Sequence, residues 1–393
     1  MRYEACLRSI AAGARSFSFL STATSAFRTQ ILANFAQCPA PILHNAQPYA
    51  VLTSARRSRP ALVTNSFTPT TAPPPDHGLE WLATPPPVYR PTVPPHPPGK
   101  TLVLACFLFL LTFCTCLIAG TQFANAYAEN QAVSWDDFVR ALTLIYSHPF
   151  QLAPGLPFAL TLLAILLTHE LGHYFACRHH HIHSSYPFFI PFPTLIGTMG
   201  AFILIRSPIR TTRALFDVGA SGPIVGFLVA VPALIFGILH AKVVPGLGDP
   251  ASAGLVLGAP LILHLLAAIF HPGVAAGSLL LHPVGRAAWV GLFATSLNLL
   301  PAAQLDGGHI LRSLSARLHR YSSIGLPFAL ILLGAFHFWP GWYVWGALLL
   351  VIRFFRFVPI YNPEPLDSRR RFGAVLTLII FALCFIPAPF LQL

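Results

Sequence analysis

The sequence predicts an all-α polytopic membrane protein with about seven transmembrane helices and a short re-entrant or interfacial β element. Three observations predict this class. The 393 residues are 55% hydrophobic and only 9% charged, their mean hydropathy is +0.65, and apolar runs of membrane-spanning length alternate with basic loops. Soluble globular domains carry about 25% charged residues, so this composition excludes that class.

The basic residues and the cysteines exclude two further classes. The formal net charge of +12 comes almost wholly from arginine, because Lys100 and Lys242 are the only lysines. The arginines gather in loops between apolar runs, where they indicate the cytoplasmic side of a membrane protein and not a nucleic-acid-binding surface. The seven cysteines include no C-x-x-C pair, so they support neither a disulfide framework nor a cysteine metal site.

Residues 1–99 are expected to form a disordered N-terminal region. Residues 1 to about 66 are rich in Arg, Ser and Ala, and Glu4 is their only acid. This composition is typical of an organellar transit peptide, and it fits equally a bacterial cytoplasmic tail or an extension upstream of the true start. Residues 69–99 are dense in proline, so we expect a semi-extended linker there.

The apolar runs and their flanking charges predict seven crossings, with every basic cluster cytoplasmic. Residues 100–155 contain the first span and an external acidic loop, and residues 316–393 contain the C-terminal transmembrane helices. The spans are expected at about residues 101–119, 156–177, 219–240, 287–300, 322–338, 342–351 and 373–390. Residues 253–270 are apolar but should not cross, because the next span must run inward for its end to meet the end of the second span.

The second span contains the pattern H-E-x-x-H at His169, Glu170 and His173. Positions i and i+4 share one helix face, so both imidazoles can reach one ion. Two imidazoles, one carboxylate and a water make an open, catalytic zinc site, and Glu170 would lie beside that water as general base. Ionisable residues in a membrane-length apolar run are functional by default. The other interpretation is a helix end whose histidines only form hydrogen bonds.

A third ligand must come from elsewhere in the chain. The carboxylates downstream of the motif are Asp217, Asp249, Asp306, Glu364 and Asp367. Asp217 is expected to N-cap the third span, and Asp249 should be external. Glu364 and Asp367 lie in a polar, arginine-flanked loop. Asp306 follows an apolar run and precedes two glycines that free the backbone, so we expect it to complete a site for one Zn2+ per chain. His309 is a rival ligand, and an Asp-Gly-Gly turn without metal is the alternative.

Residues 186–206 are predicted to be non-helical. Pro187, Pro191 and Pro193 forbid a regular helix, and residues 194–205 are β-prone with interspersed glycines. Apolar non-helical backbone is tolerated at membrane depth only against protein or a wet cavity, so we expect the β element here, beside the zinc site. It would pair with an unwound substrate strand; an apolar loop on the bilayer surface is the alternative. Small residues from 219 to 226 predict a close helix–helix approach.

Two separated motifs resemble the site-2 protease family of intramembrane zinc metalloproteases: H-E-L-G-H in one transmembrane helix, and N-L-L-P-x-x-x-L-D-G-G at the end of a later one. Residues 197–201 and 216–223 are similar to the branch without a PDZ domain, which includes bacterial members and plastid-targeted plant homologues. The resemblance covers about residues 155–315. It implies that His169, His173 and Asp306 bind zinc, that Glu170 is the general base, and that Asn298 holds the substrate backbone or the oxyanion. The family's usual N-P-x-P start is altered here to Asn298-Leu-Leu-Pro.

The resemblance therefore implies that residues 156–315 are an intramembrane metalloprotease core that cleaves a membrane protein substrate in or near a transmembrane segment. The expected partners are that substrate and the lipid bilayer, with no nucleic acid, and the oligomeric state stays open. A bacterial cytoplasmic membrane is favoured and a plastid membrane is the alternative, with the active site near the cytoplasmic side. The other function classes are a non-proteolytic membrane zinc protein, a transporter, and a zinc peptidase that uses Glu364 as third ligand.

Overall fold

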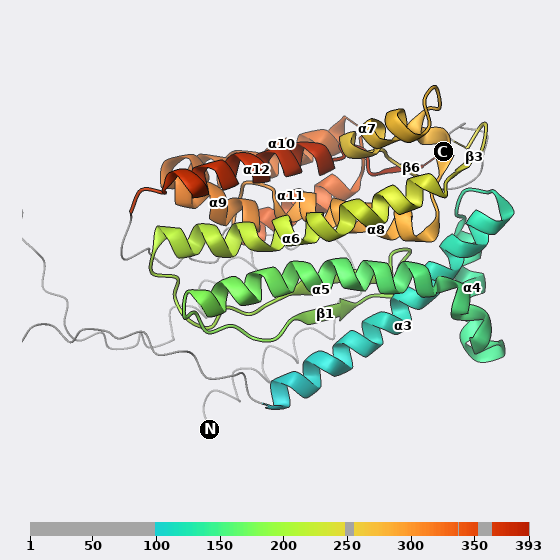
Figure 1. The fold of residues 1–393 in the computed structure, drawn as a ribbon, viewed down its shortest axis with the longest axis horizontal. Helices are drawn as coiled ribbons and strands as arrows, with labels where there is room; N and C mark the ends of the chain where they lie inside the picture. Colours follow the sequence, from blue (N-terminus) through green and yellow to red (C-terminus); the bar gives the residue numbers. More distant parts are fainter. Residues whose placement is uncertain (1–98, 248–254, 337, 353–363, 393) are drawn as a thin grey trace, which may run out of the picture. The chain divides into compact units, whose positions relative to one another are not determined.

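A computed structural model describes residues 99–247, 255–336, 338–352 and 364–392, and this part of the chain is mostly helical (Figure 1). All of the expected N-terminal region, residues 1–99, except Gly99 lies outside the described residues, and Gly99 begins the first described helix. The helical content and the apolar helices confirm the expected class of a mainly helical membrane protein at this coarse level.

Three helices among the described residues are long and apolar enough to cross a bilayer: Gly99–Glu129 (α3), Pro149–His179 and Thr212–Leu239 (α6). The second of these joins the 3-10 turn η2 (Pro149–Gly155) to α5 (Leu156–His179). The other predicted crossings coincide with helices that are shorter or less apolar: α8 (Pro283–Asn298), α10 (Ala316–Ala335), α11 (Gly341–Ile352) and α12 (Ser368–Cys384). The total of seven crossings stays a prediction.

The first helix is longer than its apolar run predicts. It continues to Glu129 because its last turns pack against the rest of the protein: the Thr121 hydroxyl donates to the Leu152 carbonyl at 3.1 Å. The predicted external loop also contains a helix, α4 (Trp135–Ser147), which begins with a capping box between Ser134 and Asp137. The hydropathy profile predicted an end that is too early, because buried polar residues of the helix lower the mean hydropathy as exposed ones do.

The predicted β element is an antiparallel pair of strands, β1 (Phe188–Pro191) and β2 (Thr198–Phe202). Its tip lies against α3, where the Gln122 amide donates to the Leu195 carbonyl at 2.7 Å. Gly197 has a φ of +87°, and a β-carbon there would meet the Cys116 α-carbon at 2.6 Å, so only glycine fits this contact. The proline-flanked stretch therefore forms a β element, as predicted, and the structure shows that it is an antiparallel hairpin.

Helix α6 starts earlier than predicted, and Asp217 is not its N-cap. The cap is Thr211, whose side chain accepts a hydrogen bond from the Ala214 N–H at 3.2 Å. Asp217 lies inside the helix, where its carboxylate contacts Arg370 of α12 at 2.6 Å and His180 at 2.7 Å. The sequence favoured a cap because aspartate is a strong capping residue. Its contact with the distant residue Arg370 cannot be recognised from local sequence.

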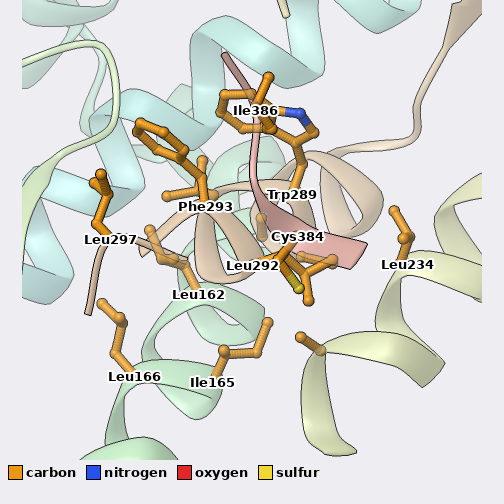
Figure 2. Packing of buried hydrophobic residues seen from close by; sticks show 14 of the residues in the cluster. Leu162, Ile165, Leu166, Leu234, Trp289, Leu292, Phe293, Leu297, Cys384 and Ile386 are labelled. Carbon is orange, nitrogen blue, oxygen red and sulfur yellow. The ribbon is translucent and has the colours of Figure 1, made fainter. Parts of the chain in front are cut away.

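Helices α5, α6 and α8 pack side by side at the centre of this part of the chain (Figure 1). Figure 2 shows the apolar side chains that meet there from these helices and from the C-terminal segment: Leu162, Ile165, Leu166, Leu234, Trp289, Leu292, Phe293, Leu297, Cys384 and Ile386. Lipid tails are as apolar as these residues, so helix association in a bilayer depends on close contact. Gly237 of α6 supplies such a contact, because its α-carbon lies directly against the backbone of Gly285.

The remaining elements are short. Helix α7 (Leu261–Phe270) has 10 residues, about 15 Å, which is about half the thickness of the hydrocarbon core. That residues 253–270 do not cross stays a prediction. Helix α12 ends at Cys384 and not near residue 390, and the strand β6 (Phe390–Gln392) then pairs with β4 (Leu255–Leu257). The other short elements are α9 (Asp306–Leu314), η3 (Ala276–Ser278), β3 (Lys242–Val243) and its partner β5 (Leu279–Leu280).

Candidate metal centre

The H-E-x-x-H motif lies in the last third of α5, and its three side chains are buried. His169, Glu170 and His173 are 4%, 5% and 6% exposed, and one potential ligand atom from each lies within 4.8 Å of the others. The two imidazoles are one helical turn apart, with ring centroids separated by 4.9 Å. The helix therefore presents two imidazoles and a carboxylate to one small volume, as the spacing predicts.

Three glycines of α6 form the surface against which this volume is built; we call Gly219, Gly222 and Gly226 the glycine stripe. The His173 ring lies directly on Gly222, and a β-carbon on Gly226 would meet Nδ1 of His169 at 3.0 Å. A β-carbon on Gly219 would meet the Asp306 carbonyl oxygen at 3.0 Å. The small-residue face that the sequence predicted thus makes room for the histidine rings as well as for a neighbouring helix.

The orientation of His173 is fixed by the backbone of α6. Its Nδ1–H donates to the Val218 carbonyl oxygen, with a nitrogen–oxygen distance of 2.6 Å. A proton on Nδ1 leaves the lone pair of Nε2 free to bind a metal, and such a hydrogen bond also holds the ring plane. Sequence patterns alone did not predict this contact, because a backbone carbonyl carries no residue-type signal.

Asp306 reaches the same volume from the other side, at the first residue of α9. Its Oδ2 lies 3.3 Å from Nε2 of His169 and 3.3 Å from Nε2 of His173. The glycines after Asp306 open a helix and not a turn, and they let α9 lie close to the backbone of residues 299–303. The structure therefore brings together the three residues that the sequence selected as metal ligands.

The loop before Asp306 is held by polar side chains of α10. Ala303 has a φ of +51°, which is strained for a residue with a β-carbon. Its N–H donates to Ser323 Oγ at 3.0 Å, and its carbonyl oxygen lies 3.0 Å from His319 Nε2. These contacts explain how a strained loop presents Asp306 at a fixed position. Sequence reasoning missed His319 and Ser323, since only their three-dimensional neighbours reveal the role.

The geometry and chemistry of the three side chains fit a zinc ion. Zinc–ligand bonds of about 2.0–2.1 Å in a tetrahedral site place neighbouring ligand atoms about 3.3 Å apart, and zinc accepts both imidazole nitrogen and carboxylate oxygen. The two separations from Asp306 Oδ2 to the imidazole nitrogens are 3.3 Å. The rival Glu364 lies elsewhere, in an exposed ion pair with Arg213 at 3.1 Å. His309, the other rival, is turned toward Gly219, and its buried Nδ1 contacts no hydrogen-bonding partner among the described residues.

Asn298 ends α8 beside the same volume. Its side-chain nitrogen lies 3.3 Å from Nε2 of His169, so the amide faces the atoms that would bind the metal. An amide N–H in this position can donate to an oxygen held near the metal. The structure thus brings all five residues selected from the sequence together, with the three motif residues buried and Asn298 and Asp306 half-buried.

Comparison with known proteins adds an independent observation. Residues 157–332 match the sequence profile of peptidase family M50. Through these residues the chain is similar to the M50 peptidases. This finding confirms the resemblance to site-2 proteases that the two motifs indicated. No solved structure matches the chain.

Curated proteins similar to this chain come from plants. It is 28% identical over 315 residues to the "probable zinc metalloprotease EGY1, chloroplastic" of Oryza sativa subsp. japonica, covering 74% of the chain and 52% of that protein. It is 31% identical over 229 residues to the Arabidopsis thaliana protein of the same name, covering 54% and 40%. It is 30% identical over 245 residues to the Arabidopsis "probable zinc metalloprotease EGY2, chloroplastic", covering 61% of the chain and 43% of that protein. The chain spans about half the length of these relatives or less.

In the M50 region the β hairpin lies next to the motif. The backbone of Ile203, the residue after β2, lies near the Glu170 carboxylate. Only one edge of β2 is paired, because β1 is its single strand partner among the described residues. The other edge of β2 carries no strand among the described residues.

An apolar cavity of about 970 Å³ opens beside the hairpin. Its lining includes Leu166, one turn before the motif, and Leu297, which precedes Asn298. The rest comes mostly from the hairpin tip and from aromatic residues: Phe293, Phe338, Trp339, Tyr343, Trp345 and Phe390. The candidate metal centre therefore has an apolar cavity beside its polar groups.

Proposed function

We propose that the chain is an intramembrane zinc metalloprotease that hydrolyses a peptide bond in or near a transmembrane segment of a membrane protein. The observation that carries this proposal is the approach of Asp306 Oδ2 to the two imidazoles of the buried H-E-x-x-H motif, at 3.3 Å from each Nε2. The motif lies in a helix long and apolar enough to cross a bilayer. A buried cluster of this kind in an apolar helix is costly without a function.

His169, His173 and Asp306 would hold the zinc ion. When bound, zinc polarises the scissile carbonyl and makes a water acidic enough to act as nucleophile at neutral pH. The Val218 carbonyl keeps the His173 ring in the orientation that exposes Nε2. Asp306 supplies the negative charge that two neutral imidazoles lack, which favours a divalent cation over a neutral occupant.

Glu170 is the proposed general base, and it adjoins the ligand atoms without being one of the three ligands. It takes a proton from the attacking water and returns a proton to the leaving amine. The Asn298 amide, 3.3 Å from His169 Nε2, donates to the oxygen on which negative charge develops. These roles require a substrate carbonyl held between Asn298 and Glu170.

The substrate is proposed to be a transmembrane segment that unwinds before cleavage, because the carbonyls of an intact helix are already hydrogen-bonded. The free edge of β2 offers backbone partners to the unwound strand. The adjoining apolar cavity of about 970 Å³ takes its apolar side chains. Together they explain how a polar reaction site can receive an apolar peptide.

The proposed setting is a multi-pass protein with seven crossings and the site near the basic, cytoplasmic or stromal side. A plastid membrane is preferred to a bacterial one, because the named relatives are chloroplastic and residues 1–66 have a transit-like composition. A fluorescent fusion of residues 1–98 tests this preference. Plastid import supports it, and retention in the cytosol of a plant cell contradicts it.

Glu170→Gln is the decisive test of the base. The variant should bind zinc like the wild type, about one ion per chain, and should lose cleavage of a transmembrane reporter substrate. Retained cleavage would refute the role of Glu170. Zinc loss in the same variant would show that the residue is a ligand.

Zinc content of Asp306→Ala and Glu364→Ala separates the two candidate third ligands. We expect zinc to be lost in the first variant and retained in the second. The reverse result would assign a different zinc-peptidase architecture. Zinc binding in the wild type without any cleavage would favour a non-proteolytic zinc protein.

A further inference from the structure

We propose that Arg370 of α12 is a positioning residue for the metal centre, acting through Asp217 on the stretch of α6 that orients His173. The inference rests on the proposed function, since it concerns the same site. It adds a residue that lies outside the family-matched segment 157–332. The C-terminal helix would then be part of the catalytic apparatus without touching substrate or metal.

The contact between Arg370 and Asp217 is a two-pronged ion pair. Nε of Arg370 donates to Oδ1 of Asp217 at 2.8 Å, and Nη2 donates to Oδ2 at 2.6 Å. His180 contacts the same Oδ2 through Nε2 at 2.7 Å. The side chains of Arg370 and Asp217 are 23% and 24% exposed. Bidentate, partly buried pairs are stronger and less screened by salt than exposed single contacts.

The ion pair acts next to the carbonyl that orients His173. Asp217 immediately precedes Val218, whose carbonyl oxygen accepts the hydrogen bond from His173 Nδ1 at 2.6 Å. On the other side of Asp217, a β-carbon added to Gly373 of α12 would meet the Phe216 ring at 3.1 Å. Helix α12 therefore contacts α6 at the two residues that precede Val218. A shift of these residues would move the Val218 carbonyl and with it the His173 ring.

Arg370 is itself held in place, as a positioning residue requires. Its Nη1 donates to Oδ2 of Asp367 at 2.6 Å, and Asp367 is the N-cap of α12, accepting from the Arg370 N–H at 2.9 Å. The same aspartate thus fixes both the helix start and the arginine side chain. The guanidinium has little freedom to follow a displaced Asp217.

A second ion pair between the same regions provides a matched control. Arg213, in the first turn of α6, contacts Glu364 at 3.1 Å, and both side chains are about half exposed, at 52% and 49%. Exposed pairs of this kind contribute little, and Arg213 does not adjoin Val218. Loss of this pair removes a tie between α6 and the C-terminal segment without disturbing the support of His173.

The test measures cobalt and zinc affinity of the full-length chain in detergent, by competition with a chelator, together with the Tm and with kcat and KM for a reporter substrate. The variants are Arg370→Gln, Arg370→Lys and Glu364→Gln. Changes in groups that support metal ligands typically weaken metal binding by about 10–100-fold. We expect about tenfold weaker binding and lower kcat with unchanged KM in Arg370→Gln, partial rescue in Arg370→Lys, and no change in Glu364→Gln.

The outcomes separate this inference from the proposed function. Equal metal affinity in Arg370→Gln and Glu364→Gln would overturn the inference, whether both variants keep the wild-type affinity or both lose it. If Arg370→Gln does not fold, the decision passes to Arg370→Lys, in which a single donor replaces the two-pronged contact; unchanged affinity there also overturns it. A wild type that binds no metal would instead overturn the proposed function.

Discussion

The two halves of the candidate metal centre are built in different ways. The helix half, with His169, Glu170 and His173, is set by one stretch of α5 lying on the glycine stripe of α6. The loop half, which ends at Asp306, is set by hydrogen bonds from α10 to a strained loop. The helix half should therefore be sensitive to added volume and the loop half to lost hydrogen bonds.

Gly222→Ala should produce the largest effect, in the helix half. The added methyl group would occupy the position of the His173 ring, and overpacking of this kind costs about 1–3 kcal/mol or more, equivalent to about 5–150-fold in binding. We expect zinc binding to fall by about 100-fold, measured by chelator competition. Gly325→Ala in α10 is the control, because a β-carbon there meets nothing within 4 Å; an equal effect in both variants contradicts a specific clash.

Ser323→Ala tests the loop half by removing a hydrogen bond without adding volume. The Ala303 N–H loses its acceptor, and an unpaired buried donor costs about 1–3 kcal/mol. We expect the free energy of unfolding to fall by about that amount and zinc affinity to fall about tenfold, because Asp306 is released. Thr377→Val, which removes a buried hydroxyl in α12, should lower stability without weakening zinc binding.

Gly226→Ala should have a smaller effect than Gly222→Ala at the neighbouring position of the stripe. A β-carbon there would lie 3.0 Å from His169 Nδ1, so a shift of a few tenths of an ångström accommodates it. We expect zinc affinity to fall by about threefold to tenfold, toward the lower end of the overpacking range. An effect as large as that of Gly222→Ala would mean that the stripe acts as a rigid unit.

Gln122→Leu should have the smallest effect on either half and should act on the hairpin. The substitution removes the hydrogen bond to Leu195 but also removes the buried Gln122 Oε1, which contacts no partner among the described residues. The two changes offset each other to within about 1 kcal/mol. We expect unchanged zinc affinity and a rise in KM of about threefold, since the hairpin tip loosens. Weaker zinc binding would show that the hairpin supports the metal ligands.

The comparison also explains what sequence reasoning could reach. The spacing of His169, Glu170 and His173 encodes a local helix face, and Asp306 could be selected because the rest of the chain offers so few carboxylates. The support of these residues is non-local: Ser323 lies 20 residues from Ala303, and Arg370 lies 153 residues from Asp217. The sequence predicted Asp217 to be a helix cap because its ion-pair partner, Arg370, is too distant in the chain to be recognised from local sequence. Likewise, the pairing of β6 with β4 has no signature in a hydropathy profile.

The apolar cavity has a consequence for chemical probes. It adjoins the candidate metal centre through Leu166 and Leu297, and six aromatic side chains contribute to its lining. A compound that joins a hydroxamate to an aromatic tail could engage both regions at once, with the head group at the histidines and the tail in the cavity. Substitutions at Trp339 or Tyr343 would then reduce potency through the tail alone, which would distinguish selective inhibition from simple chelation.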